Sequence, residues 1–319
     1  MKRNRFLTIT LGLAFLAVVL IVLFLMYQTY GNWAFALRLR GKKIIAFLLV
    51  SLAASTSTIA FQTITHNQFL TPSILGLDNL YVLIQTLLFY LVGGIQMLSQ
   101  ASVGLFLVNI LLMVGLSVLF LGFFLNRTTG NLFLLLMVGM VAGTFFSSLS
   151  TYLQVLMDPN EYDLLQGKLF ASFSNIPTQY LGIGAILIVV ASIGLWQLAA
   201  VFDVMHLGRD HAVNLGISVS ELQVVSLVLI ALLTGVSTSL VGPTLFLGFI
   251  LSTLSYHLFH TYRHRQLFLG SFLLGVILLV GGQFLVEQIF EWNTTISVVI
   301  QFVGGVFFIL KIVSERKTR

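Results

Sequence analysis

The sequence predicts an all-α, polytopic integral membrane protein in which about ten transmembrane helices form one bundle. Three observations support this fold class: the mean hydropathy is +1.04, hydrophobic residues make up 58% of the chain, and charged residues make up only 8%. Soluble domains carry roughly 25% charged residues, so this chain has too few to cover a surface that faces water. We expect a single transmembrane domain over residues 1–319.

A transmembrane helix needs about 20 mostly apolar residues, and the chain offers ten such runs in order. They are residues 6–27, 43–64, 74–98, 102–125, 132–157, 179–202, 221–240, 244–260, 267–290 and 296–313. The first run follows a basic N-terminus, as a secretory signal does. Its length is that of a membrane span, however, and no small-residue cleavage site follows it. We therefore expect the first run to be retained as a helix.

The basic residues are distributed unevenly between the two sides of the membrane. If the N-terminus is inside and ten helices cross, both termini are cytoplasmic, and eleven basic residues lie inside against five outside. Basic loops favour the cytoplasmic side, which supports this orientation. The outer cluster at residues 38–43 runs against the bias. It suggests an acidic partner outside, or it is an exception to a statistical rule.

Several classes of function find no support in the sequence. The net charge of +6 does not indicate nucleic-acid binding, because the basic residues are scattered over short loops and no such motif occurs. The chain has no cysteine and therefore no disulfide or thiolate metal site. The motifs H-E-x-x-H and G-x-S-x-G, and the phosphate loop G-x-x-x-x-G-K-[ST], are absent. We expect no catalytic residue, no metal and no cofactor in this chain.

One polar segment, at about residues 205–219, separates the sixth run from the seventh. It alternates polar residues with an apolar side and has a glycine near each end, at Gly208 and Gly216. This pattern predicts a short amphipathic helix on the water side of the membrane, offered as a surface for another protein. A solvated loop is the alternative.

Residues 61–76, FQTITHNQFLTPSILG, carry a resemblance to a known family. They are similar to the stretch Q-x-x-x-x-N-P-L-A-x-P-x-x-L-G of the permeases of ATP-driven iron–siderophore and vitamin B12 importers. The first proline of that stretch is Gln68 here. The matching residues are Gln62, Asn67, Pro72, Leu75 and Gly76.

Further motifs of the same family follow in the same order. Residues 39–43, LRGKK, stand where the family has [LI]-R-L-P-R. Residues 207–216, LGRDHAVNLG, resemble L-G-E-x-x-A-x-x-L-G with Arg209 in place of the acid. Residues 263–265, RHR, resemble D-H-R, and Gly304 falls in the G-A-P motif of the last run.

The chain also departs from the family pattern. Ser252-Thr253 replaces a P-H pair, and Glu287 stands near the place of an expected arginine. Such changes indicate a divergent branch. The run 71–86 most resembles the branch that handles catecholate siderophores such as petrobactin.

The resemblance implies a definite function. Such permeases have ten spans, pair as homo- or heterodimers in the bacterial cell membrane, and pass an iron–siderophore complex by alternating access. Two cytoplasmic ATPase subunits bind ATP and Mg²⁺ and hold a short coupling helix between spans six and seven. An extracytoplasmic substrate-binding protein docks outside. These partners, and no nucleic acid, are expected here.

The resemblance assigns candidate residues to three roles. The ATPase-coupling residues are Leu207, Gly208, Arg209, Asp210, Asn214, Leu215, Gly216 and Ile217, with Leu215 and Ile217 expected to be buried in the ATPase. The residues for docking the binding protein are Arg40 and Lys43, which otherwise only mark the start of the second span. The gate and pathway residues are Thr128, Thr129, Asn131, Thr151 and Gln154, for which a turn and helix packing are the plain interpretations.

Three other interpretations compete with this one. The spacing of His257, His260 and His264 resembles a metal site, but nearby arginines would repel a divalent ion. Within the family, vitamin B12 or haem is an alternative substrate. An ion-coupled secondary transporter is the alternative from another class, and it would require a buried ionisable residue at mid-membrane.

Overall fold

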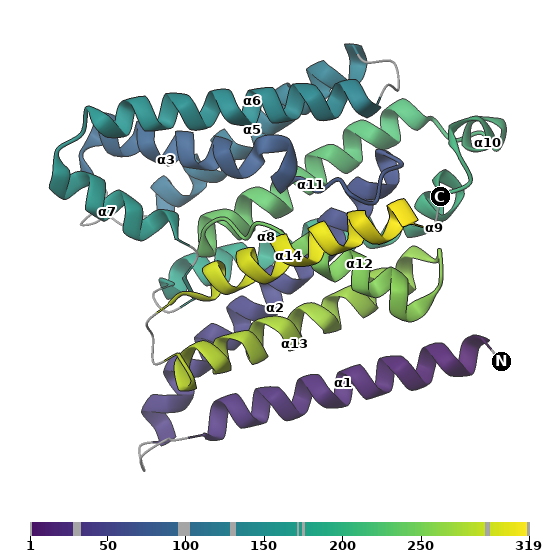
Figure 1. Cartoon of the computed structure of the whole chain (residues 1–319), viewed down its shortest axis with the longest axis horizontal. Helices are drawn as coiled ribbons and strands as arrows, with labels where there is room; N and C mark the ends of the chain where they lie inside the picture. Colours follow the sequence, from purple (N-terminus) through teal and green to yellow (C-terminus); the bar gives the residue numbers. More distant parts are fainter. Residues whose placement is uncertain are drawn as a thin grey trace.

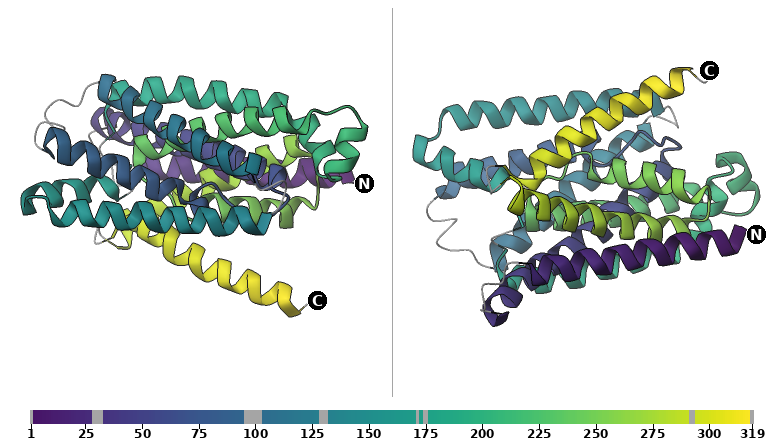
Figure 2. Two further views of the ribbon diagram at one scale, coloured as in Figure 1. Left: turned by 90° about the horizontal axis from the view of Figure 1, so that it is seen from above. Right: turned by 60° about the horizontal axis from the view of Figure 1, so that its bottom comes forward.

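The computed structural model describes residues 2–27, 33–94, 103–127, 132–170, 172–173, 176–290 and 294–317. Over these residues it is all-helical and contains no strand. The long helices lie side by side in an elongated bundle (Figures 1 and 2). Both termini and the short helix α10 lie at one end, the α10 end, and the short helix α7 lies at the other, the α7 end (Figure 1).

The helices follow the predicted order. The main ones are α1 (Lys2–Met26), α2 (Trp33–Ile64), α3 (Asp78–Val92), α5 (Val103–Arg127), α6 (Leu132–Val155), α8 (Thr178–Gln197), α11 (Val219–Val241), α12 (Leu247–Phe259), α13 (His264–Gln288) and α14 (Ile296–Lys317). The shorter ones are the π-helix η1 (Ser73–Leu77), α7 (Pro159–Leu169), α9 (Ala199–Met205) and α10 (Arg209–Asn214).

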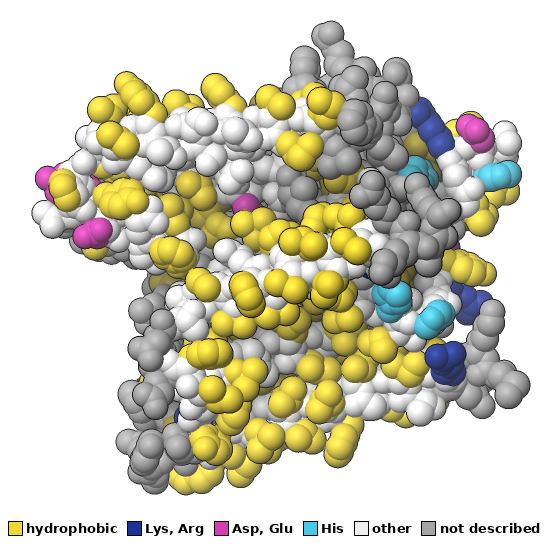
Figure 3. All heavy atoms as spheres, viewed as in Figure 1, with side chains coloured by type: hydrophobic (Ala, Val, Ile, Leu, Met, Phe, Trp, Pro, Cys, Tyr) yellow, Lys and Arg dark blue, Asp and Glu magenta, His cyan; other side chains and the backbone are white. Residues whose placement is uncertain are grey.

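The all-helical membrane fold predicted from the sequence is confirmed. Each of the ten predicted runs overlaps a helix, and seven helices among the described residues are long and apolar enough to cross a membrane. Apolar side chains cover much of the surface between the two ends (Figure 3), as lipid contact requires. The number of ten spans and the sides of the termini stay predictions.

Helix α2 lies at the centre of the bundle and packs against α8, α11, α12 and α13. Its buried half contains many hydroxyl side chains, which cannot reach water and so must find partners inside the chain. Thr56 Oγ1 donates to the carbonyl of Leu52 over 2.7 Å, and Thr63 Oγ1 donates to that of Ile59 over 2.9 Å. Several hydroxyls of α2 are thus satisfied by carbonyls of the preceding turn.

The predicted third run, residues 74–98, does not form one straight helix. Gly76 has φ +89°, which interrupts the helical geometry inside η1, two residues before α3 begins. At this point α6 crosses closely, because a Cβ on Gly76 would lie 2.7 Å from Cα of Gly143. Asn79 Nδ2 donates to the carbonyl of Gly143 over 3.1 Å and secures the crossing. Small residues thus allow the close helix contact.

The long connection after α6 contains a helix of its own. Asp158 accepts from the backbone N–H of Asn160 at 2.9 Å, and Pro159 occupies the first turn of α7. Both are strong helix-start signals. Glu161 Oε1 accepts from the backbone N–H of Gly94 at 3.1 Å, so α7 is fastened over the end of α3.

We predict that Gly76→Val strongly destabilises the protein. The left-handed backbone costs a branched residue about 1–2 kcal/mol, and overpacking against α6 adds about 1–3 kcal/mol. The midpoint of heat-induced unfolding in detergent should therefore fall by several degrees. Gly115→Val is the matched control, because no described atom lies within 4 Å of a Cβ built there. Equal midpoints for the two variants would contradict the close crossing.

Candidate functional site

The predicted amphipathic segment, residues 205–219, forms a distinct structure at the α10 end, and we call it the coupling segment. α9 ends at Met205 and the six-residue helix α10 follows. Gly208 has φ +113° and Gly216 has φ +81°, conformations that residues with a Cβ adopt only under strain. The two glycines therefore turn the chain sharply before and after α10.

The coupling segment presents apolar side chains to its surroundings. Leu207 is 62% exposed, Val213 54% and Leu215 66%, and polar neighbours such as Arg209 are exposed as well. The remaining exposed polar residues of α10 are Asp210, His211 and Asn214. Exposed apolar side chains rimmed by polar ones commonly mark a protein-binding surface. Figure 3 shows this projection at the edge of the molecule.

Two residues fasten the coupling segment to the bundle. Ala212 is fully buried, and its carbonyl accepts from the backbone N–H of Ile217 at 3.0 Å. Ile217 is half-buried against the hydrophobic core of this chain. Ile217 therefore contributes in part to the core of this chain, and Leu215 is the more exposed of the two; the burial of both in a partner stays a prediction.

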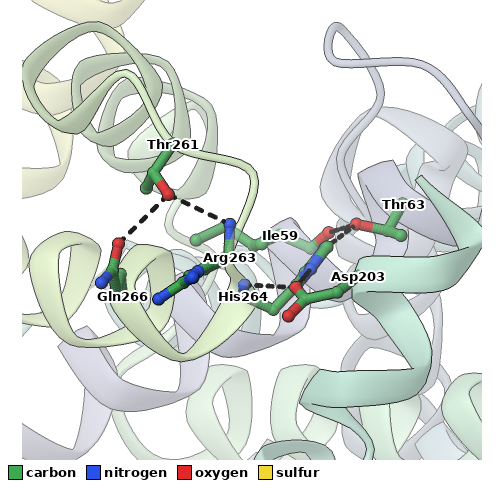
Figure 4. A network of polar contacts seen from close by, with 7 residues as sticks. All are labelled: Ile59, Thr63, Asp203, Thr261, Arg263, His264 and Gln266. Carbon is green, nitrogen blue, oxygen red and sulfur yellow. Dashed lines mark hydrogen bonds and ion pairs between the residues drawn. The ribbon is translucent and has the colours of Figure 1, made fainter. Parts of the chain in front are cut away.

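Behind the coupling segment, a polar network joins three helices (Figure 4). Asp203 Oδ1, on α9, accepts from the backbone N–H of His264 at 2.7 Å and lies 2.7 Å from its ring Nδ1. His264 Nε2 lies 2.7 Å from Thr63 Oγ1 on α2. His264 is fully buried, while the side chain of Asp203 is 33% exposed.

Asp203 was not among the site residues predicted from the sequence. The only signal was an isolated acid one residue beyond the sixth predicted run, residues 179–202. Burial alone would raise the pKa of Asp203, but the hydrogen bonds and charge of His264, together with Arg263, lower it overall. Asp203 is therefore a carboxylate at neutral pH.

A second histidine lies beside this network. The ring of His206 is 6.4 Å from that of His264, centroid to centroid. Burial and then the electrostatic effect of His264 lower the pKa of His206, and Asp203 opposes them. Burial followed by the effect of His206 also lowers the pKa of His66. Both rings are therefore mainly neutral at neutral pH.

The motif that begins at Gln62 also has a structural explanation. Gln62 Nε2 donates to the carbonyl of Gln68 and, over 3.0 Å, to Ser252 Oγ on α12. The amide thereby holds the turn after α2 against α12. Ser252 occupies one position of the P-H pair that this sequence lacks, and supplies a partner for Gln62.

The two predicted docking residues make contacts within the chain. At the end of α1, Arg40 Nη1 donates to the carbonyls of Phe24 at 3.0 Å and Leu25 at 3.2 Å, and to that of Tyr27, the residue after α1, at 2.5 Å. Lys43 Nζ lies 2.8 Å from Glu287 Oε1 on α13. Both residues therefore have structural roles at the α7 end, and their docking of a binding protein stays a prediction.

The predicted pathway residues are only partly placed by the structure. Thr151 is exposed on α6, and its hydroxyl donates to the carbonyl of Ser147 at 3.0 Å. Gln154 is half-buried and donates to Thr86 Oγ1 on α3 at 3.1 Å, so its amide serves helix packing. The predicted gate residues Thr128, Thr129 and Asn131 lie outside the described residues.

The predicted histidine cluster is divided between two environments. His264 faces Asp203, whereas His257 Nε2 lies 3.0 Å from Lys311 Nζ on α14. Within the described parts of the chain, no group of three or more His, Cys, Asp or Glu side chains is placed to hold a metal ion.

A multi-pass helical bundle with a structured, partly apolar projection at one polar end defines a membrane protein equipped to bind a partner outside the bilayer. Residues 5–314 match the model of the FecCD transport family, and the chain belongs to this family. It is accordingly a permease subunit of an ABC importer, a transport component rather than an enzyme, and a multi-pass protein of the bacterial inner membrane.

Two curated relatives resemble the chain over most of its length. The petrobactin import system permease protein YclO of Bacillus subtilis is 45% identical over 95% of this chain and 96% of its own. The permease protein FatC of the petrobactin import system of Bacillus anthracis is 34% identical over 86% of this chain and 77% of its own.

The fold is also found among solved structures. A metal-chelate type ABC transporter in an inward-facing conformation matches with a TM-score of 0.82, covering 96% of this chain and 99% of that one. The two sequences are 21% identical, so this likeness concerns the fold alone.

We predict that Lys43→Glu destabilises the protein and that adding Glu287→Lys largely restores it. Lys43 and Glu287 are 12% and 7% exposed, and removing one partner of a buried ion pair costs about 3 kcal/mol or more. Thermal unfolding in detergent measures both variants, with Arg38→Glu as the control at an exposed basic residue. If the double variant is no more stable than Lys43→Glu, the ion pair does not carry the effect.

Proposed function

We propose that this chain is the membrane-spanning subunit of an ATP-driven importer for an iron–siderophore complex, with ferric petrobactin as its substrate. The coupling segment is the observation that carries the proposal, because an ABC permease must offer its ATPase a firm surface. Leu207, Val213 and Leu215 supply exposed apolar contacts on it. The names of the two petrobactin permeases that resemble the chain support the choice of substrate.

In the proposed mechanism, cytoplasmic ATPase subunits hold α10 and supply the energy. ATP and Mg²⁺ bind in those partners, and this chain makes and breaks no covalent bond. ATP binding and hydrolysis move α10, and the bundle alternates between outward-open and inward-open states. Basic residues at the α10 end, among them Arg209 and Arg265, favour the cytoplasmic side for this end.

The substrate path is proposed to lie between this chain and a second permease, either a copy of it or a related chain. A path for a large complex needs small or polar side chains rather than charges in the lipid region. Thr151, exposed on α6, fits such a lining. Thr128, Thr129 and Asn131 are proposed for the cytoplasmic gate.

The extracytoplasmic binding protein is proposed to dock at the α7 end. Because Arg40 and Lys43 are engaged within the chain, the docking role falls mainly to exposed charges of that end. They include Arg38, Asp158, Asp163 and Lys168. Complementary charges across such a contact chiefly set the encounter rate and the orientation.

Two other functions make different predictions. The vitamin B12 import permease BtuC of Yersinia enterocolitica is 27% identical over 86% of this chain, and vitamin B12 or haem is the substrate in that alternative. An ion-coupled transporter would need no ATPase and would respond to proton or sodium gradients.

We predict that Leu215→Asp releases the ATPase subunit from the permease. A carboxylate in a desolvated contact is strongly unfavourable, so recovery of the ATPase with the tagged permease should fall about tenfold or more, the equivalent of at least 1.4 kcal/mol. Ser220→Asp adds the same charge at an exposed position just beyond the segment and should retain the ATPase. Equal recovery with both variants would refute the coupling role.

We also predict ATP-dependent uptake of ferric petrobactin. Cells that lack their own petrobactin permease should accumulate radioactive iron from this complex once the chain is produced with its ATPase and binding protein. An ATPase variant unable to hydrolyse ATP should abolish uptake. Uptake of vitamin B12 or haem instead would show that ferric petrobactin is the wrong substrate. Uptake that depends on an ion gradient alone would refute the ATP-driven importer.

A further inference from the structure

The network of Asp203, His264 and Thr63 connects elements that are far apart in the sequence. Asp203 Oδ1 accepts a hydrogen bond from the backbone N–H of His264 at 2.7 Å. The same oxygen lies 2.7 Å from the ring Nδ1 of His264. The opposite ring nitrogen lies 2.7 Å from Thr63 Oγ1, which also donates to the carbonyl of Ile59. The imidazole thus bridges α9 and α2 while belonging to α13 (Figure 4).

Asp203 also acts at the start of α13. The first N–H groups of a helix have no partner within the helix, and a neighbouring carboxylate stabilises them. Arg263 holds the N-cap position of α13 and provides no side-chain cap. In the motif D-H-R that residues 263–265 resemble, an acid stands at this place. Here the carboxylate comes from α9 instead.

The position of Asp203 gives this arrangement a mechanical consequence. Asp203 lies five residues before Gly208, where the chain turns into α10. α9 packs against α10, α2 and α13. The His264 side chain is fully buried, and its contacts with the Asp203 carboxylate are charge-assisted. A displacement of α10 must therefore break them or carry α2 and α13 along.

We propose that Asp203 and His264 are positioning residues that transmit the movement of α10 to α2 and α13 through Thr63. The proposal rests on the proposed function, in which an ATPase holds α10. It adds the route by which that movement enters the central helix of the bundle, and it assigns Asp203 two roles, capping α13 and linking α10 to it.

The test measures substrate transported per ATP hydrolysed by the full complex, with ATPase and binding protein, in proteoliposomes. Asp203→Ala should retain the ATPase subunit but lower this ratio about fivefold or more, the lower range of allosteric coupling. If Asp203 only stabilises the fold, transport and hydrolysis should fall together and leave the ratio unchanged. That result would overturn the proposal.

A second variant separates the cap from the link. Asp203→Ala combined with Arg263→Asp restores an acid at the N-cap of α13 without restoring the connection to α9. Thermal stability should recover in this double variant, while transport per ATP stays low. If thermal stability and transport per ATP both recover, Asp203 acts only as a cap of α13, and the linking role is overturned.

Two substitutions test the branch to α2. Thr63→Val removes the hydroxyl that meets His264 and should lower the ratio as Asp203→Ala does. The variant with both changes should be no worse than the more severe single one, because both interrupt one chain of contacts. Additive losses, or a normal ratio in Thr63→Val, would overturn the route through Thr63.

Thr261→Val is the matched control. Its hydroxyl also lies beside the start of α13, 3.1 Å from Gln266 Oε1 and 3.2 Å from the backbone N of Arg263 (Figure 4). It makes no described contact with Asp203, and its loss should leave the ratio unchanged. If the unmodified permease does not retain the ATPase subunit, the proposed function itself is refuted. Failure of the proposed function is therefore distinguishable from failure of the proposed route.

Discussion

The bundle depends on one constraint: a polar group within the lipid region must find its partner inside the protein. Helix α2 meets this constraint in two ways. Most of its hydroxyls donate to carbonyls of α2 itself, as Thr56 does, and need no partner on a neighbouring helix. Thr63, which also donates to its own helix, and Gln62 in addition reach residues of α13 and α12. The polar side chains that leave their own helix therefore determine which helices are held together at the α10 end.

Two departures from the family motifs are compensated by contacts between helices. Glu287, where the resemblance leads one to expect an arginine, pairs with Lys43 across α13 and α2. Arg263, in the place of an acid, is compensated by the carboxylate of Asp203. In both cases a charge has changed on one helix while its electrostatic partner comes from another. A substitution judged on its own position would look disruptive, although the folded protein satisfies it.

The sequence was most informative where periodicity and composition alone decide the structure. Apolar runs predicted the order of the helices, and Gly208 and Gly216 predicted the limits of α10. The break at Gly76 was not predicted, because an apolar run gives no sign that α6 crosses there. Asp203 was missed for the same reason, since its partner His264 lies 61 residues further along the chain. Which exposed residues face a partner is likewise determined by chains other than this one.

The contact of Arg40 with the end of α1 has a consequence for biosynthesis. The last carbonyls of a helix lack partners within it. Arg40 donates to two of them, on Phe24 and Leu25, and to the carbonyl of Tyr27 just beyond the helix, from only 13–16 residues downstream. Chains emerge N-terminus first. The hairpin of α1 and α2 can therefore close its own polar end as soon as its second helix has been made. These three carbonyls therefore have a partner before the remaining helices are made.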